Sequence, residues 1–172
     1  LMVSLGGQPY VDARLSFSSF LPASLPEAIG DKLVDAWLAR LVANPHLHDK
    51  VEFEVAITAL AFDFDDRVAA LFPDALTTKE RRVFREALAA LTVPLVRGDV
   101  APLAGEQERI EALAARPRTV VGNMAAVAGL FEDCIELGTI PFSVLARHAF
   151  IARSLLRSLV TRGVFTNPVV VG

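Results

Sequence analysis

Cysteine, tryptophan and tyrosine occur once each in the 172 residues, and histidine occurs three times. A single cysteine, Cys134, excludes an internal disulfide framework and is typical of a reducing cytoplasm. With one Trp and one Tyr there is no aromatic platform beside the basic residues, which argues against nucleic-acid recognition. The longest uncharged run near a predicted helix, 119–131, is too short to span a bilayer. We therefore expect a cytoplasmic protein with neither a nucleic-acid nor a membrane partner.

The common catalytic patterns are also missing. No glycine-rich phosphate loop of standard spacing and no nucleophile elbow with a Ser-His-Asp order is present. His46 and His48 lie two residues apart, so on a helical turn they point away from each other, and metal sites generally need three or four convergent ligands. We expect His148 to be partly buried and bonded to a carbonyl group. The sequence thus predicts no catalytic, cofactor-binding or metal-binding residue in this chain.

A cluster of carboxylates suggests a minor hypothesis, that of a metal-dependent enzyme. Paired acids can hold Mg²⁺, so a small metal enzyme could use them, but a solvated strand edge explains them adequately and is the favoured interpretation. These acids are Glu52, Glu54, Asp63, Asp65 and Asp66.

What the sequence does contain is a large apolar fraction, 53%, much of it Ala, Leu and Val at helical spacing. A chain of this length can bury enough apolar surface to form one domain, which we place at residues 1–172. The start at Leu1 and the apolar tail 168–172 predict that the chain is an interior piece of a longer multidomain protein, although trimmed ends are the alternative.

Alternating apolar and polar residues in the first third predict a small antiparallel sheet. Leu1–Leu5 and Tyr10–Phe20 flank Gly-Gly-Gln-Pro and are predicted to form a hairpin. A third strand is predicted from Val51 to about Phe62. A helix is the alternative there, because Ala and Glu are poor strand formers.

The remainder predicts a bundle of about five helices, so the expected fold class is α+β and predominantly helical. Capping boxes at Ser24–Glu27 and Thr77–Glu80 start the first two helices. Gly138 is expected to end the fourth helix, and Thr139 to cap the last one. The expected apolar faces include Ile29, Leu33, Trp37 and Leu41 in the first helix, Cys134 in the fourth, and Leu145, Ala149, Ala152, Leu155, Leu156 and Leu159 in the last.

Charge is distributed unevenly along the chain. The net charge is −3, but residues 139–172 carry four arginines and no acid. Arg153 and Arg157 lie one helical turn apart, so an anionic metabolite or partner could bind there. More often such an asymmetry reflects one part of a domain neutralising another.

Three segments carry a resemblance to a known family. They read LGGQPYVDARLSFSSFLPASL, KLVDAWLARLVANPHLHDKVEFEV and LGTIPFSVLARHAFIARSLLRSLV. Together they resemble the central region of bacterial phosphoenolpyruvate (PEP) synthase and pyruvate phosphate dikinase-like proteins. The likeness covers most of the chain and is least distinctive between Asp63 and Thr119.

The resemblance implies a modular PEP-utilising phosphotransferase as parent, in which ATP and Mg²⁺ phosphorylate a histidine that serves a pyruvate or PEP site. The phosphohistidine motif of that family, Gly-Gly leading to Thr-Ser-His, is absent, because Gln8-Pro9-Tyr10 follows Gly6-Gly7. The chain is then expected to be a non-catalytic linker domain whose partners are neighbouring domains. The alternative is an independent helical module that binds an anionic, phosphate-bearing ligand. Candidate contacts at a domain junction or phosphate are Arg14, Ser16, Ser19, Arg153 and Arg157.

Overall fold

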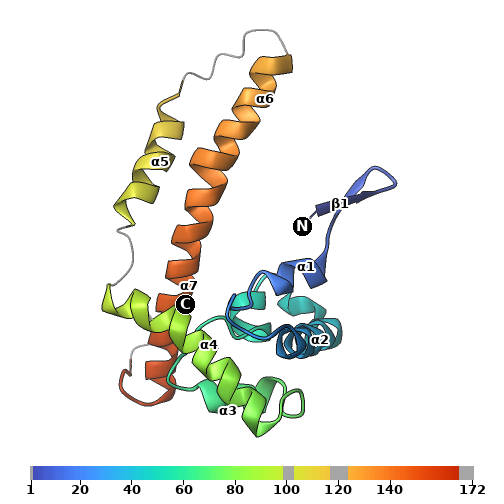
Figure 1. Cartoon of the computed structure of the whole chain (residues 1–172), viewed down its shortest axis with the longest axis vertical. Helices are drawn as coiled ribbons and strands as arrows, with labels where there is room; N and C mark the ends of the chain where they lie inside the picture. The colour runs from blue at the N-terminus through green and yellow to red at the C-terminus, as the bar shows by residue number, and fades with distance from the viewer. Residues whose placement is uncertain (1, 99–102, 117–123, 167–172) are drawn as a thin grey trace. The chain divides into compact units, whose positions relative to one another are not determined.

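A computed structural model describes residues 2–98, 103–116 and 124–166 (Figure 1). Across these ranges there are seven α-helices and one two-stranded sheet, which confirms the predicted mostly helical α+β class. The chain divides into two compact units, the first formed by Leu1–Arg97 with Arg153–Gly172 and the second by Gly98–Ala152. The predicted β-type tail, 168–172, lies outside the described residues.

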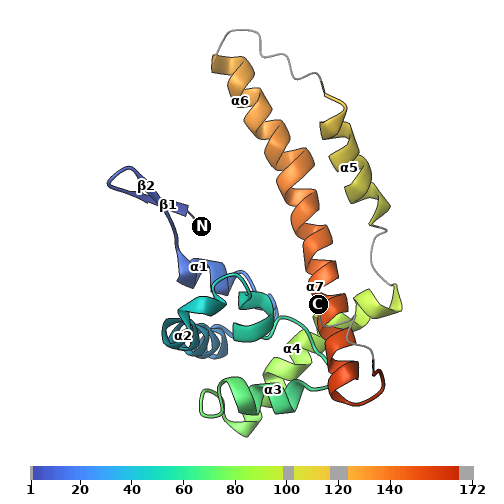
Figure 2. The same ribbon diagram turned by 180° about the vertical axis from the view of Figure 1, so that it is seen from behind.

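The hairpin that we predicted at the start of the chain is present. Strands β1 (Met2–Leu5) and β2 (Gln8–Val11) pair antiparallel, from Met2 opposite Val11 to Leu5 opposite Gln8. Gly6 and Gly7 form the two-residue turn with φ values of 59° and 78°, which glycine adopts without strain. Figure 2 shows both strands leading into the first helix.

The other predicted strands are wrong. After Val11 the chain enters helix α1 (Ala13–Ser18), because the Asp12 carboxylate accepts a hydrogen bond from the Leu15 N–H at 2.9 Å and so caps a helix. Of the expected apolar side of that strand, Phe17 alone is buried. The segment Val51–Val55 is a single π-helical turn, closer to the helical alternative than to a strand.

Helices α2 (Glu27–Ala43) and α4 (Thr78–Arg97) supply six of the fourteen residues of the first unit's buried core. Of the predicted apolar face of α2, Ile29, Leu33 and Trp37 are buried and Leu41 is partly buried. A short 3-10 turn, Pro45–Leu47, follows α2. Helix α3 (Phe64–Leu71) adds two buried apolar side chains. The buried core comprises Phe17, Ile29, Leu33, Val34, Trp37, Val55, Ala56, Ile57, Phe64, Val68, Phe72, Leu76, Phe84 and Leu88.

The two predicted capping boxes differ in outcome. Thr77 and Glu80 form one: the Glu80 carboxylate accepts from the Thr77 N–H at 2.8 Å, and the Glu80 N–H donates to the Thr77 hydroxyl at 3.3 Å. The Ser24–Glu27 box is wrong, since α2 begins after Pro26 without any side-chain cap. Helix α4 also continues through Pro94, although proline commonly breaks a helix.

In the second unit, helix α5 (Ala104–Ala114) runs beside α6 (Met124–Asp133) in both ribbon views (Figures 1 and 2). A π-helical segment, Cys134–Thr139, joins α6 directly to α7 (Ile140–Thr161). The predicted break at Gly138 and Thr139 is therefore wrong. Gly138 instead gives room to α5, because a Cβ there would lie 2.9 Å from Leu113 Cδ2.

Two predictions about buried faces are also wrong. Cys134, expected in the core, is exposed. On α7 the buried positions include Ile151, Ser154 and Ser158, whereas Leu156 of the expected arc is exposed. The helical run Met124–Thr161 is long and apolar enough, by length and composition, to span a membrane, and 11% of its most apolar stretch is buried. Buried helices of soluble proteins share that length and composition.

Candidate functional site

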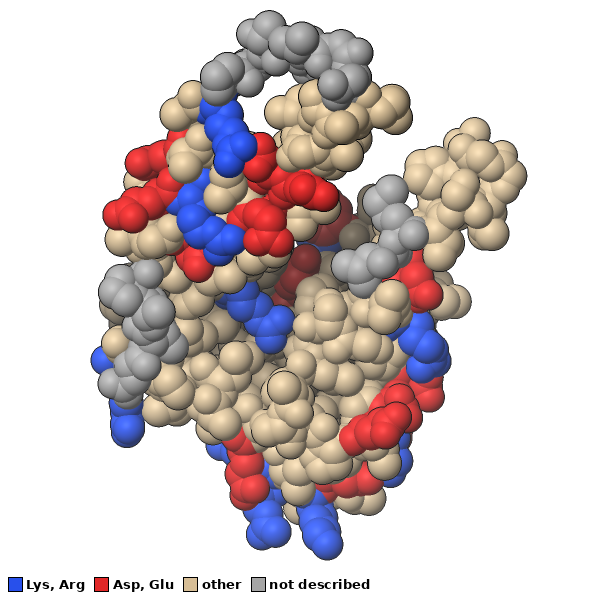
Figure 3. Space-filling model, turned by 45° about the horizontal axis from the view of Figure 1, so that its top comes forward, with Lys and Arg blue, Asp and Glu red and all other residues tan. Residues whose placement is uncertain are grey.

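The hairpin presents an uncharged surface. Its four large apolar side chains Val3, Leu5, Tyr10 and Val11 are between 45% and 66% exposed. None of residues 2–11 is charged, and Figure 3 shows the hairpin as a lobe without acidic or basic side chains. Within the described residues no third strand joins the sheet. Two-stranded sheets are marginally stable in water, and an apolar, uncharged edge is a template for pairing with another strand.

The two edges of the hairpin are not equivalent. Leu5 and Gln8 flank the two-residue turn, so the next pair, Ser4 opposite Pro9, is a pair whose backbone groups point outward. Proline has no N–H, so at Pro9 the outer edge of β2 lacks a hydrogen-bond donor. Ser4 keeps its N–H on the outer edge of β1. The β1 edge thus keeps an outward N–H at the position where the β2 edge has none, and it is the better template for a further strand.

The first set of candidate contact residues lies on and just after α1. Arg14 is engaged by an ion pair with Asp35 of α2, and hydrogen bonding to that carboxylate raises the pKa of Arg14. Ser16 and Ser19 line a cavity of about 530 Å³ together with His48. The Ser19 hydroxyl donates to the Ser16 carbonyl at 2.6 Å. The fold therefore brings the two serines together but directs Arg14 to a different partner.

The second set, the arginines of α7, makes contacts within the first unit. The Arg153 guanidinium carbon lies 4.5 Å from the centre of the Phe53 ring, a cation–π distance. Arg157 Nη2 lies 2.9 Å from Glu54 Oε1. Both arginines thus contact the π-helical turn Val51–Val55, and the Glu54 carboxylate offsets the charge of Arg157.

A polar cavity of about 230 Å³ lies beside this ion pair. Arg67 Nη2 donates to the Phe53 carbonyl, and burial lowers the pKa of its guanidinium while the carboxylate of Asp63 opposes that shift. Asp63 is 8% exposed, and its Oδ1 atom has no hydrogen-bond partner. The polar cavity is lined by Phe53, Glu54, Asp63, Arg67, Ala70, Leu71, Ser154, Arg157 and Thr161.

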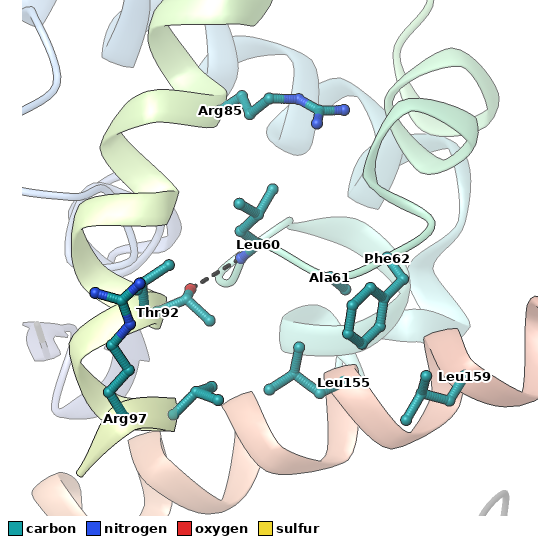
Figure 4. Close-up of a pocket in the computed structure, with 10 residues that line it drawn as sticks. Leu60, Ala61, Phe62, Arg85, Thr92, Arg97, Leu155 and Leu159 are labelled. Carbon is teal, nitrogen blue, oxygen red and sulfur yellow. Dashed lines mark hydrogen bonds between the residues drawn. The ribbon is translucent and has the colours of Figure 1, made fainter.

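An apolar groove of about 600 Å³ lies in the first unit (Figure 4). Leu155 and Leu159 come from α7, while Arg85 and Arg97 come from α4. The Leu60 N–H donates to the Thr92 hydroxyl at 3.0 Å, which fixes the segment 60–62 along the groove. Arg85 already pairs with Asp65 and lies over the Phe64 ring. The groove is an apolar surface with basic groups on α4.

The predicted carboxylate cluster is divided among different partners. Asp65 pairs with Arg85, Asp66 with Arg162 at 3.2 Å, and Glu54 with Arg157. Across the described ranges no group of three or more His, Cys, Asp or Glu side chains converges on one point. His48 Nδ1 lies 3.1 Å from the Pro45 carbonyl oxygen. His148 is half-buried, and its Nδ1 lies 2.7 Å from the Val144 carbonyl oxygen, as predicted.

Arg67 and Ser154 line the polar cavity but were not predicted from the sequence. Ser154 is buried on α7 although it is polar. Arg67 follows Asp63 by four residues, a spacing that places both on one side of a helical turn. The spacing of Asp63 and Arg67 indicates that the two side chains are neighbours, but nothing in the sequence shows that they face α7.

Comparisons with known proteins give no family assignment. The chain matches no protein-family model, no curated protein and no solved structure at a significant level. The resemblance to PEP-utilising proteins therefore stays a prediction.

Proposed function

We propose that this chain is a non-catalytic linker domain that positions neighbouring domains of a PEP synthase-like phosphotransferase. In this proposal the hairpin docks on a neighbouring domain of the same polypeptide through the β1 edge. The nucleotide-binding and phosphohistidine domains, with their ATP and Mg²⁺, belong to the rest of the parent protein. We place that parent in the bacterial cytoplasm.

The observation that carries this proposal is the unpartnered hairpin. A sheet normally buries one face or protects its edges. Here Val3, Leu5 and Val11 are exposed and the Ser4 edge is open. Strand addition to an exposed edge is a common way to join two protein modules, because main-chain hydrogen bonds supply affinity.

The docking experiment uses the longer polypeptide encoded around this segment, compared with the isolated chain by hydrogen exchange. We expect the amides of residues 2–5 to exchange more slowly in the longer polypeptide. Ser4→Pro, which removes the outward N–H, should abolish that protection, and Ser4→Thr, which keeps it, should not. Equal exchange of residues 2–5 in both proteins would contradict docking.

The non-catalytic part of the proposal has its own test. The isolated chain should not convert ATP and pyruvate to products in the presence of Mg²⁺, and any turnover would contradict it. The surrounding reading frame should encode an ATP-binding domain upstream and a Thr-Ser-His motif downstream.

Calorimetry distinguishes the linker function from the alternative, in which the arginines of α7 bind an anionic ligand. Titration with ATP, PEP and inorganic phosphate should give millimolar or weaker binding, because the Glu54 carboxylate offsets the positive charge of Arg157 and the Arg153 guanidinium lies over the Phe53 ring. Micromolar binding that is lost in Arg153→Ala and Arg157→Ala would favour the alternative.

A further inference from the structure

Asp63 is a buried carboxylate with one oxygen that lacks a hydrogen-bond partner. It precedes α3, where an aspartate usually caps the helix, but its side chain makes no capping hydrogen bond. More than nine-tenths of the residue is buried, and Oδ1 has no hydrogen-bond partner. No ion pair joins it to any described side chain within 4.0 Å. A buried polar atom without a hydrogen-bond partner is costly, so Oδ1 calls for a donor that the described residues do not supply.

Two guanidinium groups line the same cavity. Arg67 uses Nη2 toward the Phe53 and Ala56 carbonyls, and Arg157 uses Nη2 toward Glu54. Each guanidinium carries five N–H groups in a planar fork, so donors remain on both for a carboxylate. The buried Ser154 lines the cavity as well.

We infer that the polar cavity binds a small zwitterion of the α-amino-acid class. The ammonium group meets Asp63, and the carboxylate meets the free N–H groups of Arg67 and Arg157. This site is independent of the proposed docking function, because it uses no residue of the hairpin.

The balance of charges selects this ligand class. The lining holds two arginines and two acids, Glu54 and Asp63, so a ligand without net charge leaves the site neutral. A phosphate ion would add negative charge beside Asp63 and leave that carboxylate unpaired. A divalent cation would lie next to two guanidinium groups, which repel it.

The volume limits the size of the ligand. At about 230 Å³ the cavity is smaller than the roughly 300–1,000 Å³ typical of pockets for drug-sized ligands. Glycine, alanine and serine are therefore the appropriate probes.

The test measures binding to the intact 172-residue chain by isothermal titration calorimetry. We expect at least one of glycine, L-alanine and L-serine to bind. We expect methylammonium chloride, sodium acetate and inorganic phosphate to bind at least about tenfold more weakly, because each offers only one of the two charges. Equal or tighter binding of phosphate or methylammonium, or no binding of any amino acid, would overturn the inference.

Two variants locate the binding to this cavity without disturbing the core. Ala70 is an exposed residue of α3 at the cavity, and Ala70→Leu should block it and weaken binding by about tenfold or more. Its exposed neighbour Ala69 does not line the cavity, so Ala69→Leu should leave binding unchanged. Equal binding by the two variants would place the ligand elsewhere and overturn the inference.

Asp63→Asn tests the role of the carboxylate directly. It keeps the side-chain volume but removes the charge that we assign to the ammonium group. We expect weaker amino-acid binding, with the helical circular-dichroism spectrum unchanged. Unchanged affinity in a folded Asp63→Asn variant would contradict the assignment.

Discussion

Ser158 holds two segments of the first unit together through one hydroxyl group. The side chain is fully buried on α7. Its hydroxyl donates to the Leu155 carbonyl at 2.7 Å and accepts from the Phe62 N–H at 3.2 Å. An apolar residue there would leave the Phe62 N–H without its partner. A serine on the buried face of α7 is therefore required by hydrogen bonding, which a search for apolar periodicity does not detect.

We expect Ser158→Ala to lower the free energy of unfolding by about 1 kcal/mol, because the Phe62 N–H loses the buried Ser158 hydroxyl as its acceptor. Chemical denaturation followed by circular dichroism measures this. Ser18→Ala is the matched control, since the Ser18 hydroxyl also donates to a carbonyl, that of Arg14, but is exposed. Its effect should stay within about 0.5 kcal/mol. Equal effects of the two substitutions would contradict the role of Ser158.

Glu80 gives a prediction about pH. The hydrogen bond from Lys32, followed by those from the Thr77 backbone and hydroxyl, lowers the pKa of Glu80 from 4.5 to about 2. Since the pKa is depressed in the folded state, this stabilisation is complete above pH 4.5 and is lost as the pH falls toward 2. The midpoint of urea unfolding should decrease over that range.

The matched variants isolate this contribution. Glu80→Gln should flatten the dependence of the unfolding midpoint on pH between 4.5 and 2. Glu86→Gln, on the exposed side of the same helix, should keep the dependence, because its pair with Arg82 is longer, 3.8 Å. A Glu80→Gln profile that matches the original protein would contradict the assignment.

At the scale of elements, the sequence predicted a feature correctly where local chemistry alone determines it. The Gly6-Gly7 turn and the Thr77–Glu80 capping box need no distant contact, and both are present. Alternation predicted a strand through Ala13–Ser18, but the Asp12 cap produces a helix there. The glycine at position 138 leaves room for Leu113 of α5. That contact joins residues far apart in the sequence, so rules for local helix ends do not predict it. The candidate site was predicted least well, because Asp63, Arg67 and Arg157 meet only through tertiary packing.

The hairpin should form and open independently of the helices, since none of the described β2 side chains is buried. Gly7→Val forces a β-branched residue to φ near 78° and should open the hairpin. Gln8→Val, one residue later, should preserve it. In both variants the unfolding free energy of the helices should change by less than about 0.5 kcal/mol. Nuclear magnetic resonance of the residue 2–11 amides distinguishes the two, and equal spectra would contradict the role of the turn.

At the scale of the molecule, burial is concentrated in the first unit. Helices α5 and α6 of the second unit have no buried residue. Arg116 pairs with Asp133, and Arg109 Nη2 lies 3.6 Å from Glu136 Oε2. Pairs exposed in this way contribute about 0–1 kcal/mol each. The contact of Leu113 with Gly138 adds close packing between α5 and the π-helical segment.

We therefore expect the amides of α5 and α6 to exchange with deuterium faster than those of α2 and α4. Gly138→Val should accelerate exchange in α5 by about tenfold through loss of roughly 1.4 kcal/mol of packing, without affecting α2. Gly129→Val is the control, because nothing lies within 4 Å of a Cβ at Gly129. Equal acceleration by both variants would show that helix propensity, not packing at Gly138, is responsible.

The open β1 edge should also allow copies of the purified chain to associate with one another. Every copy in solution offers the same open backbone groups around Ser4, and no side chain of residues 2–11 carries a charge that would repel a second copy. Reversible association should therefore increase with concentration and persist in high salt, because no ionic contact is involved. Sedimentation at several concentrations would reveal it. A single Ser4→Pro substitution should give a better-behaved sample for crystallisation or spectroscopy.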